Sequence, residues 1–230
     1  MTSIEENIKL IEERVDASAR KTGRSRSDIM IVAVSKTVDA ARIAEARRAG
    51  IRDFGENRVQ EYLKKRDILG EGYNWHIIGP LQSNKVKYVT DGRVSLLHSL
   101  DRLTIAHELN RQCEKNGTEL NVLVQLNIAK EPTKSGVYEE DLERFLEQLS
   151  EMRSIHVKGL MAIPPPARNA DDNRPYFARM RELFERFRNA VPGAGFEYLS
   201  MGMSDDFEAA IEEGSNVVRI GTAVFGARSN

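Results

Sequence analysis

The chain has 230 residues, of which 40% are hydrophobic and 30% charged, a composition typical of a globular protein with one large domain or two small ones. The net charge of −1 gives no indication of a nucleic-acid partner, and we find no 18-residue apolar run or signal-peptide pattern, so we expect a cytoplasmic protein without a membrane partner. The single cysteine, Cys113, excludes an internal disulfide and a cysteine-rich metal site.

Two elements open the chain. Apolar residues recur at helical spacing from Ile4 to Ala19, which predicts an amphipathic helix. A strand follows over Ile29–Lys36, in which six consecutive apolar residues precede Ser35, as is typical of a strand buried on both faces in a parallel sheet. Lys36 ends this strand. A desolvated lysine amine there suits Schiff-base chemistry with a carbonyl compound, and a lysine whose ammonium reaches solvent is the other interpretation.

Strand and helix patterns then alternate to the end of the chain. Further strands are expected at Asp53–Gly55, Trp75–Ile78, Ser95–Ser99, Asn121–Asn127, Val157–Ile163, Tyr198–Met201 and Val217–Ile220. Helices are expected at Ala41–Ala49, from an Asp101 N-cap to Asn116, at Leu142–Met152, at Phe177–Phe187 and from Asp205 or Asp206 to Ile211.

This alternation predicts an α/β fold, a single (β/α)8 TIM barrel over residues 1–230 with an extra N-terminal helix. A doubly wound open sheet is the competing fold, but no G-x-G-x-x-G follows the first strand. No low-complexity linker divides the chain. In a barrel the chemistry lies at the carboxyl ends of the strands, where Lys36 is the only lysine at a strand tip.

Two glycine-containing clusters near the C-terminus suit a phosphate: Ser200–Asp205 and Arg219–Thr222. Each combines a glycine, a hydroxyl side chain and an expected helix start, where backbone N–H groups bind anions. The loops after strands seven and eight are also where barrels usually hold a phosphate. Ordinary tight turns with helix caps are the alternative interpretation.

Three further residues are candidates for ligand contacts. Asn57 is placed to hydrogen-bond a ring hydroxyl, and His76 lies within a strand, where a histidine is more often a core residue than a catalyst. Arg219 suits a ring nitrogen, a phosphate or a carboxylate partner inside the barrel. No H-E-x-x-H, paired metal-ligand spacing or G-x-S-x-G elbow occurs, so we expect neither a metal site nor a serine nucleophile.

Seven motifs spread over nearly the whole chain carry a resemblance. They are A-V-S-K-T (33–37), F-G-E-N-R-V-Q-E (54–61), W-H-I-I-G-P-L-Q-S-N-K (75–85), K-S-G (134–136), G-L-M-A-I (159–163), S-M-G-M-S-D-D (200–206) and R-I-G-T (219–222). In these motifs and their order the chain resembles the pyridoxal phosphate homeostasis proteins, the YggS/PROSC family of pyridoxal phosphate (PLP)-binding proteins.

The resemblance implies a fold-type III barrel like the N-terminal domain of alanine racemase, with PLP held as a Schiff base on Lys36. It also implies that Asn57 contacts the ring and that Arg219 lies near the ring nitrogen or the phosphate. The other implied cofactor-binding residues are Ser200, Gly202, Ser204, Gly221 and Thr222 at the phosphate, with Met201 and Met203 packed around the cofactor. His76 completes our set of candidate cofactor-binding residues.

The resemblance further implies a non-catalytic carrier that buffers PLP and supplies it to apo forms of PLP-dependent enzymes. We expect a monomer, because the sequence has no obvious exposed apolar helix face. An alternative is a small amino-acid racemase on the same site, with His76 or Lys134 as its second base. A third hypothesis is a barrel for another phosphorylated metabolite, in which Lys36 is only an ion-pair partner.

Overall fold

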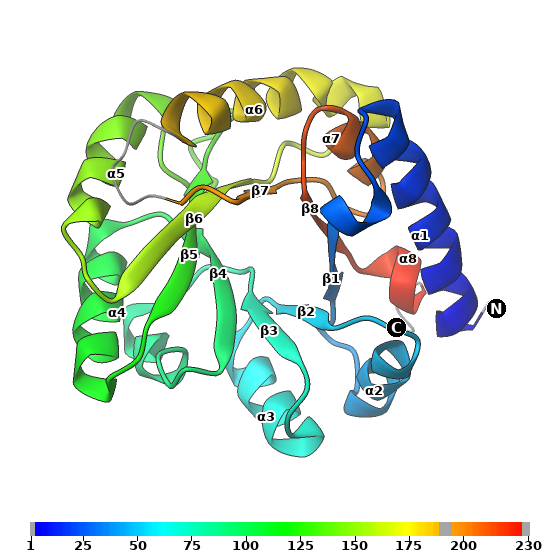
Figure 1. Ribbon diagram of the computed structural model, residues 1–230. Helices are drawn as coiled ribbons and strands as arrows, with labels where there is room; N and C mark the ends of the chain where they lie inside the picture. Colours follow the sequence, from blue (N-terminus) through cyan, green and yellow to red (C-terminus); the bar gives the residue numbers. More distant parts are fainter. Residues whose placement is uncertain (1–2, 189–194, 227–230) are drawn as a thin grey trace.

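The computed structural model describes residues 3–188 and 195–226. In this part of the chain eight parallel strands form a closed barrel in which each strand pairs with the next and β8 pairs with β1 (Figure 1). The strands are β1 (Met30–Val34), β2 (Asp53–Glu56), β3 (Asn74–Ile77), β4 (Val94–Leu100), β5 (Leu120–Leu126), β6 (Ile155–Ala162), β7 (Tyr198–Ser200) and β8 (Val217–Ile220). The predicted (β/α)8 barrel is confirmed.

Helices lie on the outside of this ring of strands (Figure 1). They are α1 (Ile4–Lys21), α2 (Ala40–Arg48), α3 (Val59–Leu69), α4 (Leu103–Asn116), α5 (Leu142–Ser150), α6 (Arg174–Arg188), α7 (Phe207–Glu212) and α8 (Thr222–Phe225). The connection from β3 to β4 contains a 3₁₀ segment, Ser83–Tyr88, in place of an α-helix.

Two local predictions differ from the structure, and one helix was not predicted. β1 ends at Val34, so Lys36 lies in the turn after the strand and not in the strand itself. α4 begins after Arg102, and the Asp101 carboxylate accepts a hydrogen bond from the Arg102 guanidinium instead of capping the helix. α3 was not predicted, because its buried face includes the charged Lys65 and therefore lacks a continuous apolar stripe.

The N-terminal helix α1 covers the barrel beside its last elements. Ile4, Ile8, Ile11, Val15 and Ala19 are buried, as the helical spacing predicts, and α1 packs against α7 and α8 (Figure 1). A capping box at Ser3 satisfies N–H groups at its start. The helix therefore holds the segment that carries the loops after β7 and β8.

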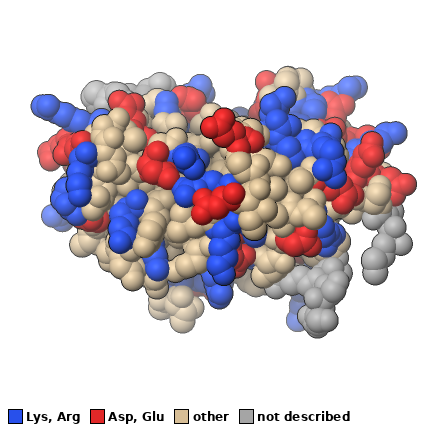
Figure 2. Space-filling model, turned by 90° about the horizontal axis from the view of Figure 1, so that it is seen from below, with Lys and Arg blue, Asp and Glu red and all other residues tan. Residues whose placement is uncertain are grey.

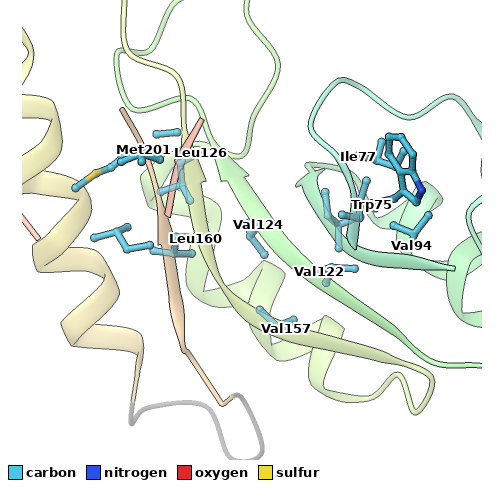
Figure 3. Close-up of a cluster of buried hydrophobic side chains, with 14 of the residues drawn as sticks. Trp75, Ile77, Val94, Val122, Val124, Leu126, Val157, Leu160 and Met201 are labelled. Atoms are coloured by element: carbon cyan, nitrogen blue, oxygen red, sulfur yellow. The ribbon is translucent and has the colours of Figure 1, made fainter. Parts of the chain in front are cut away.

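Apolar side chains fill the layer between the strands and the helices. Figure 3 shows part of this core, with Trp75 and Ile77 from β3 in one group and Leu126 and Leu160 from β5 and β6 in another. Fully burying such side chains stabilises a fold by about 1.5–3 kcal/mol each. A second, smaller apolar cluster of Leu96, Leu123 and Met161 comes from neighbouring strands and is packed by Tyr198. Its separation from the main cluster places it inside the barrel.

A chain of polar groups crosses the barrel interior. The Arg219 Nη1 donates to Ser200 Oγ at 2.6 Å, and Ser200 Oγ lies 3.0 Å from His98 Nδ1. The His98 Nε2 lies 2.9 Å from His76 Nδ1, and His76 Nε2 lies 3.1 Å from Asp53 Oδ1. All but Asp53 are buried.

One pattern of hydrogens satisfies every link of this chain. A guanidinium only donates, so the Ser200 hydroxyl accepts from Arg219 and is free to donate to His98 Nδ1. A neutral His98 then donates from Nε2 to His76, and a neutral His76 donates from Nε2 to the Asp53 carboxylate. Burial, followed by the nearby His76 and Arg219, holds the pKa of His98 well below its usual range, in agreement with a neutral ring. Two neutral histidines thus connect a buried cation to a carboxylate.

The outer surface carries mixed charge. On the face in Figure 2 basic and acidic side chains are interspersed, without a large region of one sign. None of the helices in the described ranges has the length and apolar character needed to span a membrane.

We predict that Gly159→Ala strongly destabilises the protein. Gly159 has φ of +144°, and a Cβ there would lie 1.9 Å from the Tyr198 carbonyl oxygen in the neighbouring strand. Backbone strain and overlap together should lower the free energy of unfolding by about 3 kcal/mol or more. Urea denaturation measures this. Gly195→Ala is the matched control, because a Cβ at Gly195 meets only ordinary contacts at 3.7 and 3.8 Å. Equal midpoints for the two variants would contradict the pairing of β6 with β7.

We also predict a stability loss in acid that depends on His98. The pKa of His98 is lowered in the folded protein, so below the ordinary histidine value of 6.5 the unfolded chain binds a proton that the folded chain does not. Above pH 6.5 His98 has no effect of this kind on stability. Below it, proton binding by the unfolded chain lowers the free energy of unfolding by up to about 1.4 kcal/mol per pH unit as the pH falls. Urea denaturation between pH 5 and 8 should show a shallower acid slope for His98→Gln. The exposed His107→Gln serves as control and should keep the wild-type slope.

Candidate functional site

The carboxyl ends of the strands meet at one end of the barrel, and Lys36 lies there. The residue follows Ser35 just after β1, in a turn whose next residue, Thr37, has a left-handed φ of +64°. The Lys36 side chain is half-buried, and no hydrogen bond or ion pair within the described ranges engages its ammonium. The sequence allowed either a desolvated lysine or one that reaches solvent, and a half-buried Lys36 without a partner in the described residues is intermediate between the two.

Asn57 lies at the same end of the barrel, directly after β2. Its neighbour at the end of the adjacent strand is Gly79, which follows β3, and a Cβ at Gly79 would lie only 2.3 Å from the Asn57 carbonyl oxygen. The Gly79 carbonyl accepts a hydrogen bond of 2.6 Å from the Ser99 hydroxyl. The backbone of Asn57 is thus held tightly while its half-buried side chain remains at the barrel mouth.

The two glycine clusters are joined to each other. The Arg219 N–H donates to the Gly202 carbonyl at 3.0 Å, and the Ser204 hydroxyl accepts from the N–H groups of Gly221 and Ala223 at 3.3 and 3.4 Å. Gly202 has φ of +92°, and a Cβ there would lie 2.6 Å from the Ala210 Cβ. Glycine is therefore required for the loop after β7 to reach the loop after β8.

Convergent N–H groups and a hydroxyl are the groups that bind an anion at barrel loops of this kind. Thr222 adds a second, exposed hydroxyl as the first residue of α8, and Gly221 lies against β1: a Cβ there would lie 3.4 Å from the Val34 carbonyl oxygen. The loop predicted to bind a phosphate and the turn that carries Lys36 are accordingly neighbours.

Arg219 lies deeper in the barrel than these loops. Its guanidinium donates to Ser200 Oγ and, from Nη2, to the Ala162 carbonyl at 2.9 Å. Burial lowers the pKa of Arg219 to about 10, and the Asp206 carboxylate acts against this shift. The guanidinium remains charged at neutral pH and makes no ion pair with a carboxylate in the described residues.

Ser200 differs in position from the other predicted phosphate residues. It is fully buried, and its hydroxyl contacts Arg219 and His98 inside the barrel, not the loop groups around Ser204. Its role at a phosphate stays a prediction, and the contacts that the structure gives it orient Arg219 instead.

The remaining candidates divide into core and mouth. His76 is buried with both ring nitrogens in the polar chain, which supports the core interpretation. Met201 is fully buried in the main apolar cluster near Leu126 and Leu160 (Figure 3). Met203, in the loop after β7, is exposed. Direct cofactor contact by His76 or Met201 is a prediction that these placements do not support.

Sequence reasoning missed the polar chain and a second polar cluster next to Lys36. The chain includes His98, which no motif marked, and the cluster includes Glu56 and Lys65. Alternation along β2 was the available signal, since Asp53 and Gly55 face the interior while Glu56 faces α3.

A cofactor with an aldehyde, an aromatic ring and a phosphate fits these residues. Lys36 offers an amine, the loops after β7 and β8 offer N–H and hydroxyl groups, and Arg219 offers a cation below the mouth. The described residues hold no group of three or more histidine, cysteine, aspartate or glutamate side chains suited to a metal ion.

Solved structures agree with this fit. PipY of Synechococcus elongatus with PLP bound is 35% identical, with a TM-score of 0.82 over 94% of this chain and 100% of that chain. An alanine racemase from Clostridium difficile is 17% identical, with a TM-score of 0.75 over 99% of this chain and 57% of that chain. The second similarity shows the shared barrel fold alone.

Sequence relatives match almost end to end. The pyridoxal phosphate homeostasis protein of Aquifex aeolicus is 43% identical over 224 residues, 97% of each chain. The protein of the same name from Pseudomonas aeruginosa is 44% identical over 229 residues, 99% of this chain and 97% of that one. The family model for the alanine racemase N-terminal domain matches residues 2–229. The chain belongs to the pyridoxal phosphate homeostasis protein family, whose barrel is the alanine racemase N-terminal domain.

Proposed function

We propose that this protein binds PLP through Lys36 and acts as a carrier that buffers the free cofactor. The observation that carries the proposal is the placement of the turn that holds Lys36 beside the linked loops of Ser204 and Gly221, at one end of one barrel. PLP supplies an aldehyde, which a lysine amine converts to a Schiff base with loss of one water. Because hydrolysis reverses this bond, a half-exposed lysine suits binding and release.

A carrier role fits the surroundings of the site better than turnover does. A racemase needs a second base, and His76 uses both ring nitrogens in the polar chain while Lys134 is an exposed loop residue. A guanidinium at the ring nitrogen would also leave that nitrogen unprotonated, which weakens the ring as an electron sink. We therefore assign no catalytic residue, and we propose a cytoplasmic monomer that supplies apo-enzymes.

Borohydride trapping tests the cofactor and its lysine. Protein incubated with PLP should show a visible absorption band that borohydride removes, with the pyridoxyl group mapped to Lys36. Lys36→Ala should lose the band, while its free energy of unfolding stays within about 0.5 kcal/mol of wild type because the side chain lies in a half-exposed turn. Lys134→Ala, a control on another exposed lysine, should keep the band. A reducible band in Lys36→Ala would overturn the assignment.

Chiral analysis separates a carrier from a racemase. We expect no conversion when the PLP-loaded protein is incubated with L-alanine and other L-amino acids, because neither candidate second base, His76 or Lys134, is placed to serve. Turnover at about 1 per second or faster, the range of ordinary enzymes, would reject the carrier proposal. Formation of any other product from the amino acid, without racemisation, would indicate a different PLP reaction and would also reject the carrier proposal.

A further inference from the structure

A cluster of polar side chains lies on the outer side of the barrel wall, between α3 and the ends of β1 and β2. We call it the Lys65 cluster; its members are Ser35, Glu56, Glu61 and Lys65. None of its side chains belongs to the interior chain or to the loops after β7 and β8. Its contacts converge on the turn that carries Lys36.

Lys65 is the centre of this cluster. It is 8% exposed, and its ammonium donates to the Ser35 carbonyl at 2.7 Å, to Glu56 Oε1 at 2.7 Å and to Glu61 Oε2 at 3.4 Å. An ammonium has three N–H donors, so each has one acceptor here. A lysine amine so fully engaged is held in one position.

Glu56 and Ser35 form the buried part. The Ser35 hydroxyl donates to Glu56 Oε1 at 2.6 Å, and the second carboxylate oxygen, Oε2, is buried without a hydrogen-bond partner. Burial raises the pKa of Glu56, while hydrogen bonds from Lys65 and Ser35 act against that shift. Burying this carboxylate and its lysine partner lowers the stability of the fold relative to a packed apolar pair of the same size.

Glu61 holds the other side of the turn. Its Oε2 accepts the Thr37 N–H at 2.9 Å, and Thr37 has the left-handed φ of +64° that side chains rarely adopt. Burial raises the pKa of Glu61, but the hydrogen bond from the Thr37 N–H and the charge of Lys65 lower it more, so the pKa lies below its usual value. The residues on both sides of Lys36 are therefore bound to α3 through their backbones.

We propose that the Lys65 cluster positions Lys36 for bond formation with an aldehyde. Lys65 and Glu61 fix Ser35 and Thr37, and so set the direction of the Lys36 side chain without touching the ligand themselves. Lys65 does bind a strand side chain, Glu56, but attachment of α3 alone would not require the further bonds that Lys65 and Glu61 make to the backbone on either side of one lysine. The inference rests on the proposed function, because the aldehyde is that of PLP.

Two ligands distinguish positioning from folding. PLP has the aldehyde, and pyridoxine 5′-phosphate has the same ring and phosphate with an alcohol in its place. We compare their dissociation constants in Lys65→Met and Glu61→Gln, with Lys64→Met as control, because Lys64 is an exposed neighbour on the same helix.

Loss of a charge-assisted hydrogen bond on the turn should weaken PLP binding roughly tenfold in both variants. Binding of pyridoxine 5′-phosphate should change by less than about twofold, since it needs no bond to Lys36. Equal losses for the two ligands would mean a purely structural role and would overturn the proposal. PLP affinities equal to that of Lys64→Met would overturn it as well.

A measurement without cofactor separates this inference from the proposed function. Hydrogen exchange of the Thr37 amide should be roughly tenfold faster in Glu61→Gln than in Lys64→Met, because its acceptor loses its charge. Competitive acylation should show a changed reactivity of the Lys36 amine in Lys65→Met. If wild type fails to trap PLP on Lys36, the proposed function is wrong, and these two readouts still decide whether the cluster fixes the turn. Unchanged exchange and reactivity would overturn the positioning role.

Discussion

The pairing of β8 with β1 is the constraint on which the site depends. Its register places Arg219 opposite Val32, which brings the end of the last strand beside the end of the first. Lys36 follows β1 and Gly221 follows β8, so the turn that carries Lys36 and the loop predicted to bind a phosphate, far apart in sequence, become neighbours only when the barrel closes. An open sheet with the same strands would leave them at opposite edges.

Closure also creates an interior in which an uncompensated charge is costly. Arg219 is buried there, and a series of hydrogen bonds through Ser200, His98 and His76 connects its guanidinium to the Asp53 carboxylate. Each group in the series donates to the next, so their dipoles are aligned between the two charges. In the pattern of hydrogens that runs in this direction both rings are neutral, so only the ends are charged. This arrangement gives Arg219 a fixed orientation and explains why Ser200 belongs to the interior and not to the loops.

Periodicity and strand order made the barrel predictable from the sequence and selected a candidate site at one of its ends. Alternating elements identified the barrel, and the rule that chemistry lies at strand ends selected Lys36, Ser204 and Gly221. The same reasoning did not predict α3, whose buried Lys65 breaks the apolar stripe, because a buried lysine is recognisable only with its partners in view. His98 was missed for the same reason: its partner Ser200 is 102 positions away.

Lys36 thus lies between two polar networks with different consequences. The interior chain fixes a cation, and because all its members but Asp53 are buried, its buried part can change only if the core does. The Lys65 cluster fixes the backbone on both sides of Lys36 but leaves the side chain itself half-buried and without a partner in the described ranges. A lysine with a rigid base and a free amine needs little reorganisation to form a bond and little to lose it. That combination favours reversible loading, because a network that also held the amine would have to break each time the cofactor enters or leaves.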